Sequence, residues 1–325
     1  MRTSELQYEL PPELIAQAPV PRRDESRLLV YDRATGAVRH RLFRDLHEEL
    51  PPRSLVVVND TRVLPARLEL HRPAGGQTEV LLLEPVKPEA TNGVPGGGLW
   101  EALARPSRRL REGMQLRGDG KVTLVRRLGQ GRWLVTLDRA PAGAIPLPPY
   151  IHEQPNDLER YQTVYADEEG SAAAPTAGLH FTTELLSRLD VERVTLHVGL
   201  DTFRPVTTAE VEQHAIHGER YRVSALAWER IRVAQHVTAV GTTSVRTIEA
   251  LSLGAPLQGR TSLFITPGFT FERVDALVTN FHLPCTSLLA LTMAFAGIEQ
   301  VRELYQIAIE ERYRFYSFGD AMLLL

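Results

Sequence analysis

The stretch LVVVNDTR, residues 55–62, indicates the fold class of this 325-residue chain. Its first four residues are apolar and mostly β-branched, which is the pattern of a strand buried on both faces of a sheet. The run ends abruptly in Asn59, Asp60, Thr61 and Arg62. In α/β sheets the carboxyl ends of strands are where ligands bind, so these four residues are a candidate site. Taken alone they fit an exposed turn equally well.

Working outward from this strand, the chain before residue 66 and after residue 150 alternates between strand-like and helix-like segments. We predict a hairpin over 28–31 and 37–42, strands over 193–198, 237–240, 262–265 and 276–278, and helices over 183–189, 225–236, 245–253, 286–297 and 299–313. Five strands, the one over 55–58 included, end in polar or glycine-rich clusters, which begin at Asn59, Gly199, Gly241, Thr266 and Thr279. We expect these five strand ends to converge on one shared site.

Residues 66–149 have a different character. Short strand-like runs recur there without helices between them: ARLELH, TEVLLLE, LWEALAR, KVTLVRRL and RWLVTL, with a weaker run near MQLRG. This pattern predicts a small antiparallel β-barrel. We therefore expect an α/β fold, with a layered, discontinuous catalytic domain of residues 1–65 plus 150–325 and an inserted β-barrel domain of residues 66–149.

The barrel segment carries a local excess of positive charge. From Arg105 to Arg132 there are nine basic residues against Glu112 and Asp119, although the whole chain has a formal charge of −3. Such a patch can follow a phosphate backbone, and a solvated basic face is the alternative. The candidate contacts to RNA are Arg62, Arg105, Arg108, Arg109 and Arg111.

Composition is that of an ordinary globular protein, with 43% hydrophobic and 24% charged residues. No apolar run is long enough to span a membrane, and the N-terminus lacks the apolar core of a signal peptide. The single cysteine, Cys285, cannot form a disulfide within the chain. These features predict a cytoplasmic location without membrane contact.

Two further stretches offer chemistry. In APTAGLHF, residues 174–181, a proline and a glycine fix a turn that presents Thr176 and His180. In GTTSVR, residues 241–246, a glycine turn precedes a helix start, where N–H groups and hydroxyls can bind an anion. Arg246 follows one turn later and can pair with a carboxylate through two hydrogen bonds. An ordinary helix cap with a surface arginine explains the second stretch as well.

Several common chemistries lack support in the sequence. His214 and His217 have a spacing that suits a metal, but no acidic or cysteine partner follows at a recognisable distance, so no metal site is expected. No glycine-rich dinucleotide motif, no P-loop and no nucleophile elbow is present. His282 can be a core histidine or a functional one, and Cys285 fits an inert buried thiol better than a nucleophile.

Taken together, the motifs resemble the S-adenosylmethionine:tRNA ribosyltransferase-isomerase family of queuosine biosynthesis. The matching stretches run through the whole chain: 28–33, 58–68, 147–151, 161–166, 174–181, 195–199, 240–250, 279–284 and 315–323. Two stretches depart from the usual family pattern. Asp201 precedes Thr202-Phe203 where the family has glycine, and Cys285-Thr286-Ser287 replace a basic residue followed by Ser-Thr.

The resemblance implies an unusual use of S-adenosylmethionine. Its ribosyl part is transferred to 7-aminomethyl-7-deazaguanine at the wobble position of a tRNA and isomerised, giving epoxyqueuosine-tRNA, adenine and methionine. The sulfonium acidifies the 5′ carbon, so a positioned base can begin the reaction by removing a proton there. No metal or redox cofactor is implied, S-adenosylmethionine being a co-substrate, and we expect a monomer.

Residue roles follow from the resemblance as hypotheses. His180 is the first choice for the general base or acid, as a loop residue able to titrate near neutrality, and His282 is the second, with Asp60 orienting either. The Thr176–Gly178 turn forms the lip of the donor pocket. The methionine carboxylate is expected at Gly241, Thr242, Thr243, Ser244 and Arg246, and nucleobase edges at Asn280, Tyr316 and Asp320.

Two rival functions predict different products. An RNA-binding module without chemistry would bind tRNA and release no adenine. A methyltransferase with the same donor would release S-adenosylhomocysteine instead of free adenine.

Overall fold

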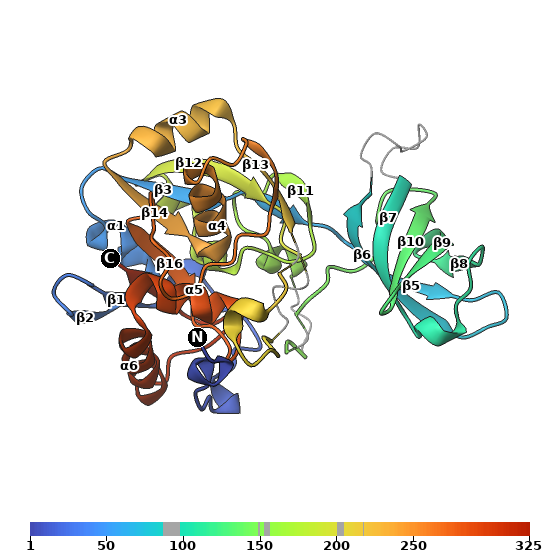
Figure 1. Cartoon of the computed structure of the whole chain (residues 1–325), viewed down its shortest axis with the longest axis horizontal. Helices are drawn as coiled ribbons and strands as arrows, with labels where there is room; N and C mark the ends of the chain where they lie inside the picture. Colours follow the sequence, from blue (N-terminus) through green and yellow to red (C-terminus); the bar gives the residue numbers. More distant parts are fainter. Residues whose placement is uncertain (87–97, 149, 153–156, 200–204, 217) are drawn as a thin grey trace. The chain divides into compact units, whose positions relative to one another are not determined.

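The structure is a computed structural model of the chain and describes residues 1–86, 98–148, 150–152, 157–199, 205–216 and 218–325. It contains two compact units (Figure 1). The α/β unit comprises Met1–Arg62, Pro149–Glu168 and Ala174–Leu325, and the barrel unit comprises Val63–Pro148 and Glu169–Ala173. The fold class predicted from the sequence, an α/β protein with a small antiparallel barrel, is confirmed.

The α/β unit is built on a nine-stranded sheet with the order β15-β13-β12-β3-β14-β16-β17-β1-β2. In that order the strands are β15 (Gln258–Thr261), β13 (Glu219–Arg222), β12 (Asp190–Leu196), β3 (Ser54–Asn59), β14 (His236–Val240), β16 (Ala276–Asn280), β17 (Ala321–Leu324), β1 (Arg27–Tyr31) and β2 (Val38–Leu42). The four central strands β12, β3, β14 and β16 are parallel, and β17 runs antiparallel to β16. The apolar run at 55–58 forms β3, which is buried along its whole length.

Helices pack on this sheet. They are α1 (Leu46–Glu49), α2 (Thr183–Leu186), α3 (Ala225–Val233), α4 (Gly241–Ser252), α5 (Ser287–Ala296) and α6 (Ile298–Glu310). The 3-10 turns in the same unit are η1 (Thr3–Leu6), η2 (Pro12–Leu14), η3 (Arg23–Glu25), η4 (Phe43–Asp45), η6 (Leu158–Tyr161), η7 (Thr176–His180) and η9 (Val211–Gln213). One hydrophobic cluster joins sheet residues such as Val56, Val58 and Val278 to Phe43 and Phe181.

Three helices begin at side-chain caps, as their sequences require. Thr182, Ser224 and Thr286 accept hydrogen bonds from the backbone N–H groups of Leu185, Ala227 and Leu289. Such a bond satisfies one of the N–H groups that the first turn of a helix leaves unpaired. Thr182 therefore caps α2, at the start of the helix predicted over 183–189.

The barrel unit is a closed barrel in the order β10-β7-β6-β5-β8-β9. Its strands are β5 (Arg67–His71), β6 (Gln77–Pro85), β7 (Gly98–Arg105), β8 (Gln115–Gly118), β9 (Gly120–Gly129) and β10 (Arg132–Leu137), with η5 (Ser107–Arg109) after β7. Buried and accessible residues alternate along β10, so that Trp133 and Val135 face the interior. All six strand-like runs of the sequence form strands. The remaining strands, β4 (Thr61–Val63) and β11 (Glu168–Ser171), pair as a separate two-stranded sheet.

Some elements differ from expectation. The strand predicted over 262–265 is wrong, because the strand is β15, which ends at Thr261 and pairs antiparallel with β13. Thr266 therefore does not follow a parallel strand, and it drops out of the shared site. Helix α4 begins at Gly241 rather than near Val245, so the whole Gly-Thr-Thr-Ser run is helical.

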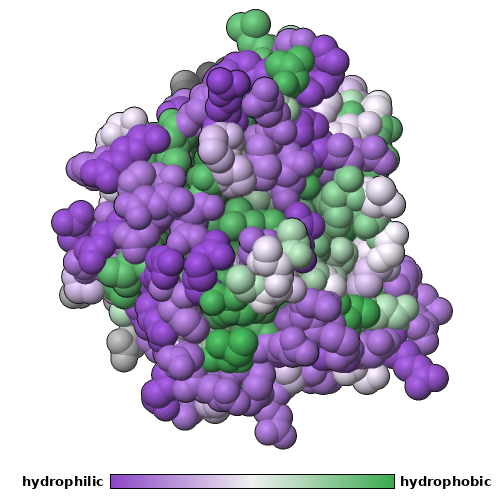
Figure 2. Space-filling view, turned by 90° about the vertical axis from the view of Figure 1, so that its left-hand side faces the viewer, coloured by the Kyte–Doolittle hydropathy of each residue, from purple (hydrophilic) through white to green (hydrophobic). Residues whose placement is uncertain are grey.

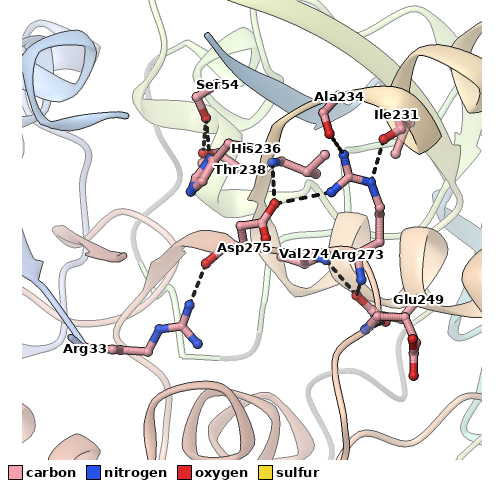
Figure 3. Close-up of polar contacts among 12 residues, drawn as sticks. Arg33, Ser54, Ile231, Ala234, His236, Thr238, Glu249, Arg273, Val274 and Asp275 are labelled. Atoms are coloured by element: carbon pink, nitrogen blue, oxygen red, sulfur yellow. Dashed lines mark hydrogen bonds and ion pairs between the residues drawn. The ribbon is translucent and has the colours of Figure 1, made fainter. Parts of the chain in front are cut away.

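A polar network fixes the edge of the sheet where the parallel strands begin (Figure 3). Buried Glu249 of α4 accepts hydrogen bonds from the backbone N–H groups of Glu272, Arg273 and Val274 at 2.9, 3.1 and 2.9 Å. The Arg273 guanidinium reaches the carbonyl of Ile231 at the end of α3, and the Asp275 carboxylate accepts from Val237 of β14. These contacts tie α3, α4, β14 and β16 together at this edge and leave the opposite edge for a site.

The side of the α/β unit that carries α6 and β2 is mainly hydrophilic around its periphery, with hydrophobic residues gathered near the middle (Figure 2). Exposed apolar side chains in this unit include Leu226, Val233 and Leu253. Single exposed apolar residues are normal on a globular surface.

Candidate active site

The sheet brings the polar strand ends to one edge. Because β3, β12, β14 and β16 are parallel neighbours, Asn59, Gly241 and Asn280 all lie at their carboxyl ends. Strand β17 begins at the same edge, since Ala321 pairs with Asn280. Contacts link these ends directly, for the Nδ2 of Asn59 donates to the Oγ1 of Thr243 at 3.2 Å.

His180 lies in the interior of this edge, at the end of η7. It is 4% exposed, its ring stacks on Phe43 at 4.9 Å, its Nδ1 is 2.6 Å from the Oγ of Ser26, and its Nε2 is 3.2 Å from the Nδ2 of Asn280. Burial, with the nearby Arg314 and Arg23 cations, lowers the pKa of His180 from 6.5 to about 3. The expectation of a loop histidine able to titrate near neutrality is therefore wrong.

His282 is a second buried and neutral histidine. Its Nε2 is 2.8 Å from the Oγ1 of Thr279, and its backbone N–H donates to the hydroxyl of Tyr305. Burial lowers the pKa of His282 to about 3. Its side chain also lines a pocket, so the residue is both a satisfied core histidine and part of a cavity wall.

That small pocket has a volume of about 40 Å³, and two of its lining residues carry an orphaned polar atom. Neither the Oδ1 of Asn280 nor the hydroxyl of Tyr316 has a hydrogen-bond partner among the described residues, and both residues are more than nine-tenths buried. Tyr316 has a φ of +76°, which strains a residue other than glycine. The lining comprises Tyr150, Thr176, Asn280, Phe281, His282, Leu283, Thr286, Leu288, Tyr316 and Ser317. Unpaired buried polar atoms beside a strained residue make this pocket a candidate ligand site.

Asp60 lines a different and larger cavity, of about 530 Å³. Its Oδ1 accepts a hydrogen bond from the Oγ1 of Thr195 at 2.7 Å. Burial raises the pKa of Asp60, the Thr195 bond partly opposes this, and the Glu168 carboxylate adds to it. Arg193, Glu192 and Arg222 lie among the other lining residues. The structure gives no hydrogen bond between Asp60 and either histidine, because Asp60 bonds to β12 instead.

The start of α4 is the stretch at which the sequence predicts an anion site. Gly241 has a φ of +82°, and Gly241 through Ser244 are buried. Arg246, however, forms a buried ion pair with Glu219 of β13 and donates to the carbonyl of Leu263. Because its guanidinium already has a carboxylate partner, the structure does not present Arg246 to a substrate.

Asp320 is likewise occupied within the protein. Its two carboxylate oxygens accept from the backbone N–H groups of Arg27 and Arg314, each at 2.8 Å. Burial raises the pKa of Asp320, and these backbone bonds lower it. The carboxylate thus fixes the chain around β1 and β17. The backbone carbonyl oxygen of Asp320 lies 3.4 Å from the Nδ2 of Asn280.

Gly178 shows why η7 can approach the core so closely. A Cβ at this position would lie 2.1 Å from the hydroxyl of Tyr165 and 2.8 Å from the Cγ2 of Thr163. We predict that Gly178→Ala lowers the free energy of unfolding by about 1–3 kcal/mol, because overpacking displaces buried neighbours. Urea unfolding measures the effect. Gly259→Ala is the control, since its added Cβ meets only ordinary contacts, and equal stability of the two variants would contradict the close packing of η7.

The barrel arginines expected to contact RNA are accessible. Arg105, Arg108, Arg109 and Arg111 are exposed around η5, and none forms an ion pair with another described residue. Arg62, in the α/β unit, pairs with Glu159 at 2.8 Å. The four barrel arginines are thus open to solvent, whereas Arg62 has a partner.

Three residues at this edge escaped the sequence reasoning: Ser26, Tyr150 and Ser317. Ser26 precedes β1 and contacts His180, and the hydroxyls of Tyr150 and Ser317 bond each other beside the small pocket. Ser317 falls inside the matching stretch 315–323, and Tyr150 inside 147–151, so motif membership was the available signal.

Several features singled out in the sequence do not contribute to the candidate site. His217 and the Asp201-Thr202-Phe203 stretch lie outside the described residues. Cys285 is buried with its Sγ 3.7 Å from the carbonyl of Thr3, and burial raises the pKa of its thiol. Across the described part of the chain there is no cluster of metal-ligating side chains, and no helix with the length and hydropathy of a membrane span.

Comparison with known proteins gives consistent matches over the full chain. A family model described as queuosine biosynthesis protein matches residues 3–324. An S-adenosylmethionine:tRNA ribosyltransferase-isomerase of Rubrobacter xylanophilus is 51% identical over 100% of this chain and 98% of its own. One from an Anaeromyxobacter species is 50% identical over 100% and 99%. The crystal structure of S-adenosylmethionine tRNA ribosyltransferase from Thermotoga maritima matches with a TM-score of 0.56 and 37% identity, covering 99% of this chain and 100% of that one.

Proposed function

The chain belongs to the queuosine biosynthesis protein family and is an enzyme, and from this premise we propose its reaction. It transfers the ribosyl moiety of S-adenosylmethionine to 7-aminomethyl-7-deazaguanine at the wobble position of a tRNA and isomerises it. The products are epoxyqueuosine-tRNA, adenine and methionine. The relatives that cover the whole chain carry the name of this transfer.

The observation that carries the chemistry is a buried carboxylate beside a cavity. Asp60 has a pKa raised by burial, one hydrogen bond from Thr195, and a place in the wall of the cavity of about 530 Å³. A carboxylate with a raised pKa is a stronger base than an exposed one. We assign to Asp60 the removal of the proton that the sulfonium acidifies at the 5′ carbon. His180 and His282 act as neutral groups, since each has a pKa of about 3.

Substrate recognition is assigned to the same edge of the sheet. The buried start of α4, Gly241 through Ser244, supplies N–H groups and hydroxyls for the methionine carboxylate. Thr176, Asn280 and Tyr316 line the small pocket and receive the edge of a nucleobase. Gly178 permits the close approach of η7, and Asp320 holds the chain around the pocket. The reaction as proposed uses no metal or redox cofactor. The enzyme that carries it out is proposed to be a cytoplasmic monomer.

The barrel unit is proposed to bind tRNA through its exposed arginines. We predict that replacing Arg108 and Arg109 by Gln weakens tRNA binding and lowers the salt slope of log Kd by about 1 for each of the two arginines that binds a phosphate. Kd measured over a series of salt concentrations tests this. Arg188→Gln, an exposed arginine of the α/β unit, is the control. An unchanged slope in the barrel variant would contradict the assignment.

A labelling experiment tests the reaction itself. Two samples of S-adenosylmethionine, one labelled in the ribose and one in the methyl group, are incubated with the enzyme and the modified tRNA. Ribosyl transfer moves only the ribose label into the tRNA. Methyl label in the tRNA would establish a methyltransferase, and binding of tRNA without either label would establish an RNA-binding module.

A further inference from the structure

We infer that His180 is a positioning residue: it holds the amide of Asn280 so that the Oδ1 of Asn280 accepts a hydrogen bond from a neutral N–H group of a nucleobase at the small pocket. The identity of the ligand as a nucleobase rests on the proposed function. The orientation of the two side chains rests on their hydrogen bonds alone.

The amide of Asn280 has one possible orientation. Its Nδ2 is 3.0 Å from the carbonyl oxygen of Tyr316 and 3.4 Å from that of Asp320. A carbonyl oxygen can only accept, so the amide atom that faces both must be the nitrogen. The same nitrogen is 3.2 Å from the Nε2 of His180. Its N–H groups are therefore used within the protein.

The tautomer of His180 follows from the other end of the chain of bonds. The hydroxyl of Ser26 is 3.1 Å from the carbonyl of Arg23, to which it must donate. Its oxygen then accepts from the Nδ1 of His180, so Nδ1 carries the proton and Nε2 holds the lone pair. That lone pair accepts from Asn280. Both ends of the network thus require the same neutral tautomer, which leaves no lone pair of His180 free to act as a base.

In this network the Oδ1 of Asn280 is left without a hydrogen-bond partner. It is buried and unpaired among the described residues, and its side chain lines the small pocket. The unpaired hydroxyl of Tyr316 lies in the same lining. An amide oxygen requires a donor, and a buried amide oxygen without one is destabilising. A bound N–H group removes that destabilisation.

The lining decides which donor fits. None of the described residues around the pocket carries a carboxylate, and His282 is neutral, so an ammonium ion would enter without a counter-charge. A volume of about 40 Å³ accommodates an amino-sized group or the edge of a ring, and not a whole nucleoside. The rings of Tyr150 and Tyr316, 4.2 Å apart, form part of the wall. This chemistry fits a neutral exocyclic amine or ring N–H, from either adenine or a deazaguanine.

A pair of matched variants tests the positioning role. In His180→Gln the amide oxygen can occupy the place of Nε2 and accept from Asn280, whereas in His180→Asn the shorter amide reaches Ser26 and leaves Asn280 without an acceptor. The KM in question is that of the substrate whose nucleobase binds at the small pocket. We expect His180→Gln to keep this KM within a few-fold of the wild type and His180→Asn to raise it by about 10–100-fold, which corresponds to the loss of one or two well-placed hydrogen bonds. Comparable loss of kcat in both variants, with KM unchanged, would overturn the inference and assign His180 to proton transfer.

A second readout does not depend on activity. Long-range ¹H–¹⁵N NMR spectra of the histidine-labelled full chain report which ring nitrogen carries the proton. The His180 signal is identified by its absence from the spectrum of His180→Gln. We expect this signal to show a proton on Nδ1 and none on Nε2. A proton on Nε2, or on both nitrogens at neutral pH, would overturn the network.

Ligand binding completes the test. Adenine and 7-deazaguanine are titrated separately into the wild type and into Asn280→Leu. The inference expects at least one of them to bind the wild type, and to lose about tenfold or more in affinity without the Oδ1 acceptor; the base that shows this loss is the source of the N–H group. Equal affinity in both proteins, or binding of neither base to the wild type, would overturn it. If the wild type meets these expectations but transfers no ribosyl group, the proposed function is refuted and the inference about His180 and Asn280 stands.

Discussion

Replacing Glu219 by Ala is expected to lower the free energy of unfolding by about 3–5 kcal/mol. Glu219 and Arg246 form an ion pair whose side chains are only 8% and 11% exposed. Glu219 also accepts a hydrogen bond from the backbone N–H of Gly199 at 2.8 Å. Removing the carboxylate leaves a buried guanidinium without its counter-charge. Urea unfolding of the two proteins measures the difference.

The control is an exposed pair of the same chemistry. Glu229 and Arg232 of α3 are more than half exposed, so Glu229→Ala is expected to cost about 0–1 kcal/mol. The double variant Glu219→Leu/Arg246→Met should recover most of the loss, because apolar replacement of a buried pair is often neutral. A cost below about 1 kcal/mol for Glu219→Ala would mean that Arg246 does not depend on this partner, and would reopen its role as a substrate ligand.

Acid is expected to destabilise the α/β unit through its neutral histidines. His180 and His282 have folded-state pKa values of about 3, against 6.5 for the free side chain. Between these values the unfolded chain binds protons that the folded protein does not, so stability is unaffected above pH 6.5 and falls as the pH drops toward 3. From pH 7 to about pH 5, each histidine should cost about 2 kcal/mol.

Subtraction isolates the contribution of one histidine from the rest of the protein. Asp60 and Asp320 have raised pKa values, so they oppose the loss at low pH in every variant. The free energy of unfolding in His180→Gln should therefore change by about 2 kcal/mol less between pH 7 and pH 5 than that of the wild type. His152→Gln, at an exposed position, should follow the wild type. Parallel curves for the wild type and His180→Gln would show that His180 titrates normally in the folded state.

Strands with a strong local pattern were predictable. The apolar run at 55–58 formed a central parallel strand, and six alternating runs formed the barrel, because burial on fixed faces imposes those patterns. Strand β15 was missed, since Gln258-Gly-Arg-Thr261 has no apolar alternation and pairs at an exposed edge with β13. Strand β17 reads as a continuous apolar run, and its place between β16, to which it is antiparallel, and β1, to which it is parallel, depends on contacts far apart in sequence.

The candidate site was predictable in position and less so in its chemistry. Asn59, Gly241 and Asn280 follow parallel strands, so their place at one edge followed from the fold class. The partner of Arg246 could not be predicted, because Glu219 lies on a strand that the sequence did not show. Burial of His180 depends on Phe43 and Ser26, which are more than a hundred positions away, and only the folded chain reveals that its imidazole is neutral.

Release of free adenine is the measurement that tests the proposed function most directly. The full-length enzyme is incubated with S-adenosylmethionine and with tRNA that carries 7-aminomethyl-7-deazaguanine, and the small-molecule products are quantified by mass spectrometry. Adenine and methionine should appear in equal amounts, each matched by one modified tRNA, and unmodified tRNA should yield neither. S-adenosylhomocysteine as the product, or tRNA binding with no adenine released, would contradict the assignment of this chain as a ribosyltransferase-isomerase.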